Sequence, residues 1–191
     1  MRIPRVVGVL AATAAVGGLL AGCGSKTATR PVATPLPGAS SAPATSPQQQ
    51  HNQADVVFLQ NMITHHTQAL TMSQTARTQA SSPQVKDLAG RIETEQSPQI
   101  QQMSGLLTEW GVPAPSTAGA MGHAQMPGMV SGAGFDRMFL QMMIVHHQGA
   151  VDMSQTELAQ GSNPTTHNLA QQIISAQQAE ISEMQTLLQV I

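Results

Sequence analysis

Two adjacent histidine pairs, each flanked by methionines, are the residues of this sequence best suited to chemistry. The two sets are Met62, His65, His66 and Met72, and Met143, His146, His147 and Met153. The 191 residues include 12 methionines and seven histidines, but only one cysteine and no tyrosine. Thioether and imidazole groups are therefore the main ligands that this chain offers to a metal ion.

The chemistry that suits these groups is copper binding, with Cu(I) favoured over Cu(II) where sulfur predominates. A thioether also needs no deprotonation before it binds a metal. We expect two inward-facing sets, one in each half of the chain. They are His65 with Met62 and Met72, and His146 with Met143 and Met153. Because adjacent residues of a helix diverge by about 100°, His66 and His147 are expected to face a neighbouring helix or a second site.

A second group of the same donors lies in a Gly- and Pro-rich stretch between the two histidine pairs. Its members are Met121, His123, Met126 and Met129. Such a stretch has no core to fill, and its composition is typical of metal capture. Two alternatives remain open: the methionines pack over the end of the folded domain, or they scavenge oxidants.

The helical methionines and histidines also have a purely structural interpretation. Methionine at helical spacing commonly fills a core. A buried imidazole can be satisfied by a hydrogen bond from a neighbouring polar side chain, and the candidate partners are Gln96, Gln177 and Glu180. The same three side chains would orient the histidines in a metal site.

An internal repeat organises the chain. Residues 55–110 align with residues 136–191 at a constant offset of 81 without a gap, with 24 identities in 56 positions. In each repeat, apolar residues recur at steps of three and four, which predicts two amphipathic helices. Ser82 followed by Pro83, and Asn163 followed by Pro164, are typical of a capped helix start. Each repeat is therefore predicted to be a helical hairpin.

Neither hairpin could bury its apolar face alone, so the two are expected to pack together. The predicted fold is an all-α, antiparallel four-helix bundle of the ferritin-like kind, built from hairpins 51–110 and 134–191 and a linker 111–133. If the helices run up-down-up-down, the first and third are parallel and diagonal, and their histidine pairs lie at the same height. Residues equidistant from a hairpin turn lie side by side. We therefore expect one layer of four thioethers, from Met62, Met103, Met143 and Met184.

A family resemblance covers both repeats, about 112 residues. The pattern Phe-x-x-x-Met-Ile-x-His-His-x-x-Ala-x-x-Met, followed by a helix with Gln-x-x-x-Ile-x-x-Met, resembles the bacterial family of domains of unknown function that carries the number 305, a ferritin-like group. The resemblance implies an exported four-helix domain, and several members are associated with copper binding in the cell envelope. The family pattern has Glu before the Ile of the second helix. Glu180 matches it, whereas Gln99 replaces it in the first repeat.

The beginning of the chain predicts export and a lipid anchor. Arg2 and Arg5 precede an apolar run at 6–20, and Leu20-Ala21-Gly22-Cys23 resembles the bacterial lipobox. We expect removal of residues 1–22 and acylation of Cys23. The protein would then be anchored to the outer face of the cell membrane or in the periplasmic space. Residues 23–50 are rich in Pro, Ala, Ser and Thr and are expected to form a disordered tether, which spans roughly 90 Å when fully extended.

Several classes of function are disfavoured. A di-iron site of the ferritin kind needs Glu-x-x-His motifs, and no Glu in this chain has His three residues later. The only lysines, Lys26 and Lys86, offer no activated nucleophile, so no catalysis is expected. The net charge is −2, which disfavours nucleic acid as a partner. The competing hypothesis is a metal-independent structural or interaction module of the cell envelope. The sequence does not identify a protein partner, and it does not show whether the chain forms a homo-oligomer.

Overall fold

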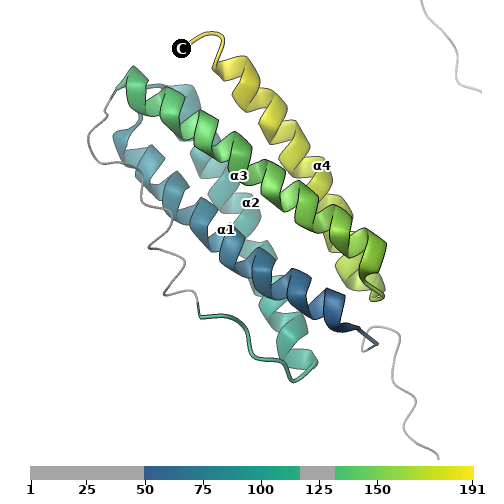
Figure 1. Ribbon diagram of the computed structural model, residues 1–191. Coiled ribbons are helices and arrows are strands. Elements are labelled where there is room, and N and C mark those ends of the chain that lie inside the picture. Colours follow the sequence, from purple (N-terminus) through teal and green to yellow (C-terminus); the bar gives the residue numbers. More distant parts are fainter. Residues whose placement is uncertain (1–49, 117–131) are drawn as a thin grey trace, which may run out of the picture. The chain divides into compact units, whose positions relative to one another are not determined.

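Four helices make up the domain (Figure 1). The computed structural model describes residues 50–116 and 132–191. The helices are α1 (Gln53–Gln79), α2 (Pro83–Glu109), α3 (Ala133–Gln160) and α4 (Pro164–Leu187). They form an antiparallel four-helix bundle without a strand in the described residues, and this confirms the predicted fold class. Among these residues, no helix has the length and apolar character needed to cross a membrane.

Several predicted features lie outside the described residues. They are the signal peptide at 1–22, the acylated Cys23, the tether, and the loop residues Met121, His123, Met126 and Met129.

The helix starts follow the local signals in the sequence. The Ser82 hydroxyl accepts the backbone N–H of Val85, and the Asn163 side chain accepts the N–H groups of the next turn. Pro83 and Pro164 occupy the first helical position, where no backbone donor is needed. The predicted starts of α2 and α4 are thus confirmed.

The relative direction of α1 and α3 differs from the predicted one. The two helices pack against each other and run in opposite directions (Figure 1). Asp55, at the start of α1, lies beside the turn that ends α3, and Asp136, at the start of α3, lies beside the turn that ends α1. The up-down-up-down order, with parallel and diagonal first and third helices, is therefore wrong.

Two equivalent aspartates explain this arrangement. The Asp136 carboxylate accepts the backbone N–H groups of Ser81 and Ser82, both at 2.9 Å. The Asp55 carboxylate accepts the N–H of Ser162 at 3.1 Å and that of Asn163 at 3.0 Å. Each hairpin thus supplies the group that caps the turn of the other hairpin, and this contact exists only if α1 and α3 are antiparallel.

The arrangement gives the two repeats a pseudo-two-fold axis perpendicular to α1 and α3. As a result, the end of α2 and the start of α3 lie at opposite ends of the bundle. α1 itself is about 40 Å long, for 27 residues.

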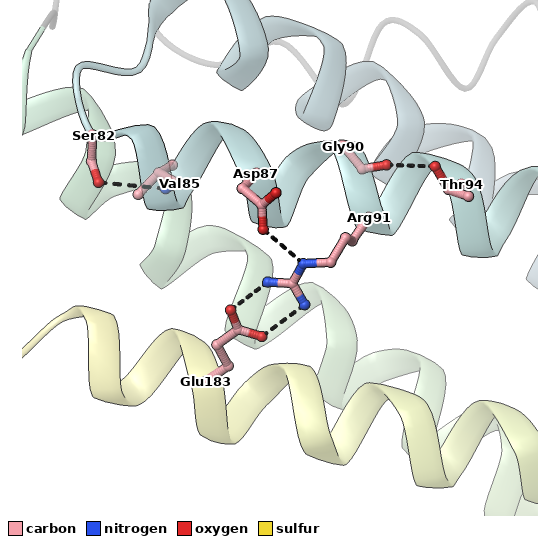
Figure 2. A network of polar contacts seen from close by, with 7 residues as sticks. All are labelled: Ser82, Val85, Asp87, Gly90, Arg91, Thr94 and Glu183. Carbon is pink, nitrogen blue, oxygen red and sulfur yellow. Dashed lines mark hydrogen bonds and ion pairs between the residues drawn. The ribbon is translucent and has the colours of Figure 1, made fainter.

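One ion-pair network joins the outer helices α2 and α4 (Figure 2). Both terminal nitrogens of Arg91 contact the Glu183 carboxylate, and Arg91 Nε donates to Asp87 at 3.0 Å. The equivalent positions in the other repeat are Gln172 and Gln102, so the repeat symmetry does not reproduce this ion pair. The bridge is solvent-exposed and contributes little to stability.

The core consists of two clusters rather than one continuous set of layers. Met143 and Met184 are buried in one cluster, near Phe135 at the start of α3. Met62 and Met103 are buried in the other cluster, near Leu169 at the start of α4. The predicted layer of four thioethers is therefore wrong, because antiparallel helices carry equivalent residues to opposite ends of the bundle.

A buried carboxyl group distinguishes one end of the bundle from the other. Glu157 is 1% exposed, and its equivalent in the first repeat is Ala76. Glycine at position 161 leaves room for this side chain, because a Cβ atom there would contact Glu157 Oε1 and lie 2.8 Å from the Glu157 backbone oxygen. Burial raises the pKa of Glu157 to about 7, and the nearby Asp55 carboxylate acts in the same direction. Folding therefore favours the protonated form of Glu157.

Glu157→Gln is expected to remove one source of pH dependence. The folded pKa lies above the unfolded value, so the stabilising contribution is complete below the unfolded pKa and is lost as the pH rises through about 7. Between pH 5 and pH 8 the wild-type protein should lose roughly 1–2 kcal/mol relative to the variant, with allowance for solvent screening. Urea denaturation of both proteins at the two pH values measures this difference. Glu109→Gln, at an exposed carboxylate, is the control, and a pH-independent difference for Glu157→Gln would contradict the assignment.

Candidate metal centre

The centre of the bundle contains a stacked pair of imidazoles. The ring centroids of His65 and His146 are 3.6 Å apart, with an interplanar angle of 30°. Both residues lie near the middle of their helices, where the pseudo-two-fold axis passes. The two histidine pairs therefore do lie at the same level, as expected, although the antiparallel direction of α1 and α3 is the reason.

The second histidine of each pair turns toward the neighbouring helix, which confirms the expectation for these two residues. His66 and His147 are both 0% exposed. His66 Nε2 lies 2.8 Å from Gln99 Oε1 on α2, and His147 Nε2 lies 2.7 Å from Glu180 Oε2 on α4. In each pair the two ring centroids are 6.4 Å apart. Four imidazoles thus lie in a row across the bundle.

These hydrogen bonds determine which ring nitrogen is available. Because Gln99 Oε1 and Glu180 Oε2 accept, Nε2 of His66 and of His147 carries the proton. In His66, which burial keeps neutral, Nδ1 then has the free lone pair. A carboxylate or carbonyl that accepts from the far nitrogen is the usual support of a metal-ligating histidine.

Five ring nitrogens in this row are buried without a side-chain hydrogen-bond partner in the described residues. They are Nδ1 of His65, His66 and His147, and both ring nitrogens of His146. Gln96 and Gln177 were predicted as partners of the histidines. Both side chains are buried, and both keep polar atoms without a hydrogen-bond partner in the described residues. Of the three predicted partners, the structure assigns that role to Glu180 alone, and Gln99 takes it in the first repeat. An unpaired buried polar atom lowers the stability of the fold. The unpaired ring nitrogens are therefore available to coordinate a metal ion.

Burial keeps three of these imidazoles neutral, those of His65, His66 and His146. Burial lowers the pKa of His65 to about 4 and that of His66 to about 3. For His146, burial and then the neighbouring His65 lower the pKa to about 2. Protons therefore do not compete for the ring nitrogens near pH 7, and a metal ion would meet free lone pairs.

The predicted thioether ligands divide into three groups. Four are fully buried in the core clusters, where packing accounts for them: Met62, Met103, Met143 and Met184. Met153 is half-buried and lines a pocket between α1 and α3 together with Glu157. Met72 lines a groove together with His146, the first histidine of the other repeat's pair. The groove therefore combines donors from different repeats.

One donor in that groove was not among the predicted ligands. Met142 lines the groove with Met72 and His146. The sequence carries a signal for it, because the equivalent residue in the first repeat is Asn61. In the part of the chain that the structure describes, no group of three or more His, Cys, Asp or Glu side chains is arranged to hold a metal ion. A metal site among these residues would therefore need thioether sulfur beside imidazole.

Comparisons with known proteins find the same fold in several solved structures. A DUF305 fragment from Deinococcus radiodurans is 31% identical, with a TM-score of 0.62, and the match covers 73% of this chain and 98% of that chain. CopM in its Cu(II)-bound form is 31% identical, with a TM-score of 0.62, over 71% of this chain and 95% of that one. CopM in its Cu(I)-bound form is 32% identical, with a TM-score of 0.60 and the same coverage. Among curated proteins there is no match.

The family model described as "Domain of unknown function (DUF305)" matches residues 55–188. This range includes both hairpins, both histidine pairs and both capping aspartates. The chain belongs to the DUF305 family.

Proposed function

We propose that this protein binds copper through imidazole and thioether groups in the middle of its helical bundle. The observation that carries the proposal is the row of four histidines, in which five buried ring nitrogens have no side-chain hydrogen-bond partner in the described residues. CopM, which shares about a third of its residues with this chain, has been solved with Cu(I), Cu(II) and silver. That similarity supports the same class of ion here.

Cu(I) is the form that we favour. Neutral imidazoles and thioethers are ligands that Cu(I) prefers, and neither has to lose a proton at neutral pH. Met72 and Met142 bring thioether sulfur to the edge of the histidine row, beside His146. The carboxylate nearest to the row, that of Glu180, is already hydrogen-bonded to His147 and orients it.

We also infer the setting in which this would happen. The signal peptide and Cys23 favour an exported lipoprotein that is anchored to the membrane, with residues 23–50 as a tether. In that compartment a non-catalytic role in copper sequestration, tolerance or delivery fits thioether ligands, because free thiols would be oxidised there.

A second candidate function is a metal-independent interaction module of the cell envelope. One observation favours it: Met62, Met103, Met143 and Met184 are fully buried and serve the core without any metal. In that case the histidine row would be a structural polar layer.

A copper titration separates the two candidates. The chain without residues 1–22 is titrated with Cu(I) against a chromophoric chelator, in a background in which Met121, Met126 and Met129 are replaced by Leu to remove the loop donors. We expect tight binding, and we expect the double variant His65→Gln/His146→Gln to bind at least about tenfold more weakly. His167→Gln, a half-buried histidine of α4, is the matched control.

The outcomes are distinct. Copper affinity that is unchanged in the double variant would exclude the central histidines as ligands. No tight binding by the wild-type chain, with the loop intact, would favour the interaction module. Circular dichroism of each variant checks that the helices remain formed.

A further inference from the structure

We propose that the groove between α1 and α3 beside His146 is a binding site for one soft monovalent metal ion. Its ligands are the thioethers of Met72 and Met142 and the imidazole of His146. This inference rests on the proposed copper function and deepens it, because it names the ligand set, the face of the bundle and the number of sites.

The groove has the shape and the lining of an accessible site. It has a volume of about 410 Å³ and is lined by Met72, Gln141, Met142, Val145 and His146. Met72 is 3% exposed and lies on the inner side of the groove, whereas Val145 is 74% exposed and marks the side open to solvent. An ion from solvent could reach the buried histidine row at this point.

Helix geometry explains why these donors meet. Met142 and His146 are four residues apart on α3, so their side chains are neighbours on one helix face. Because α1 and α3 are antiparallel, the segment that follows His65 in α1 lies beside the segment that precedes His146 in α3. Met72 is in the first of these segments and Met142 is in the second. The antiparallel packing thus brings together one sulfur from each repeat.

The nitrogen ligand in this groove is free to bind. Both ring nitrogens of His146 are buried and have no side-chain hydrogen-bond partner in the described part of the chain. In contrast, Nε2 of His147 is engaged by Glu180. His146 is therefore the member of its pair whose imidazole is not held by a side chain of the neighbouring helix.

The repeat symmetry predicts one such site per chain and not two. The equivalents of Met72, Met142 and His146 are Met153, Asn61 and His65. Asn61 and Met153 line a different pocket, of about 130 Å³, which also contains the Glu157 carboxyl group and does not include His65. An amide oxygen is a hard ligand and a thioether is a soft one, so the Met142 position decides which face binds a soft ion. The lining of the Met142 groove includes no carboxylate that would favour Mg²⁺ or Ca²⁺.

Silver(I), which resembles Cu(I) in its ligand preference and does not change oxidation state, is the probe for the test. The chain without residues 1–22, in the background with Met121, Met126 and Met129 replaced by Leu, is labelled at the methionine methyl groups and titrated with Ag(I) by NMR. We expect the methyl signals of Met72 and Met142 to shift at one equivalent of Ag(I). Met142→Asn, which introduces the residue of the first repeat, is expected to lower the affinity at least about tenfold.

The matched control is Met138→Leu, on the same helix and one turn before Met142. Met138 and Met142 are both half-buried and pack against the same core cluster, but Met138 does not line the groove, so its loss should leave the Ag(I) affinity unchanged. Methyl signals of Met72 and Met142 that stay in place at saturating Ag(I), or an unchanged affinity of Met142→Asn, would overturn the groove site. If His65→Gln/His146→Gln still weakens copper binding in that case, the proposed function stands. If the wild-type chain binds neither ion, both proposals fail.

Discussion

Acidification from pH 7 to pH 5 is expected to lower the free energy of unfolding by on the order of 5 kcal/mol. Burial lowers the pKa of His65, His66 and His146 to about 4, 3 and 2, from the ordinary histidine value of about 6.5. The unfolded chain therefore takes up protons below pH 6.5, whereas the folded chain does not. The stabilising contribution of these histidines is complete above the unfolded pKa and is lost as the pH falls toward the folded values. A loss of this size is comparable with the total stability of many domains.

Urea denaturation of the metal-free protein at pH 7, 6 and 5 measures this loss. The double variant His65→Gln/His146→Gln removes two of the three histidines, so its stability should fall much less steeply with acidification. His167→Gln serves as the control for loss of a histidine outside the row. Parallel pH profiles for the wild-type protein and the double variant would show that the histidine row does not cause the acid sensitivity.

Asp55→Asn is expected to cost about 3 kcal/mol of stability near pH 7. The Asp55 carboxylate accepts hydrogen bonds from the turn between α3 and α4 and from its own helix start. The donors are the backbone N–H groups of Asn52, Ser162 and Asn163 and the hydroxyls of Ser162 and Thr166. An amide at position 55 would point an N–H group at these donors and leave some of them buried without an acceptor. Asp136→Asn, at the carboxylate that caps the other turn, should cost about 2 kcal/mol, because fewer donors lose their acceptor.

The cost of Asp55→Asn should also depend on pH. Burial by itself raises the pKa of Asp55, but the backbone hydrogen bonds from Asn52 and Asn163 outweigh it and hold the pKa well below its usual value. The stabilisation by Asp55 is therefore present above about pH 4 and is lost as the pH falls further. Denaturation at pH 7 of both variants and of Asp152→Asn, an exposed carboxylate of α3, provides the comparison. A change in the free energy of unfolding below about 0.5 kcal/mol for Asp55→Asn would show that capping of the α3–α4 turn by Asp55 does not stabilise the fold.

Those parts of the fold that depend on residues close in sequence could be predicted from the sequence. Ser82 and Asn163, each before a proline, act on the next turn of the same helix, so local pattern locates the starts of α2 and α4. The direction of α1 relative to α3 depends instead on Asp55 and Asp136, whose partners are more than 50 residues away. The spacing of apolar residues does not indicate such a contact. The only indication in the sequence is that both repeats begin with an aspartate.

In the candidate site, too, some features could be predicted from the sequence and others depend on contacts between distant residues. The level of the histidine pairs was predicted correctly because a residue in the middle of a helix meets its equivalent whichever way the helices run. The thioether layer was wrong because Met62 and Met143 are displaced from the middle, and antiparallel packing moves them apart. Met142 was missed because its role depends on its neighbour across α1, whereas the only sequence signal is its difference from Asn61.

The pseudo-two-fold axis through the His65–His146 stack has a consequence for the origin of the chain. Packing of this kind is isologous, as in a homodimer whose protomers present the same patch to each other. A single hairpin with one capping aspartate and one histidine pair already carries a self-complementary surface. Joining two such hairpins in one chain by gene fusion leaves this surface intact. Two halves made as separate polypeptides should consequently assemble into the same structure, and fusion freed each half to acquire its own residues, such as Met142 and Glu157.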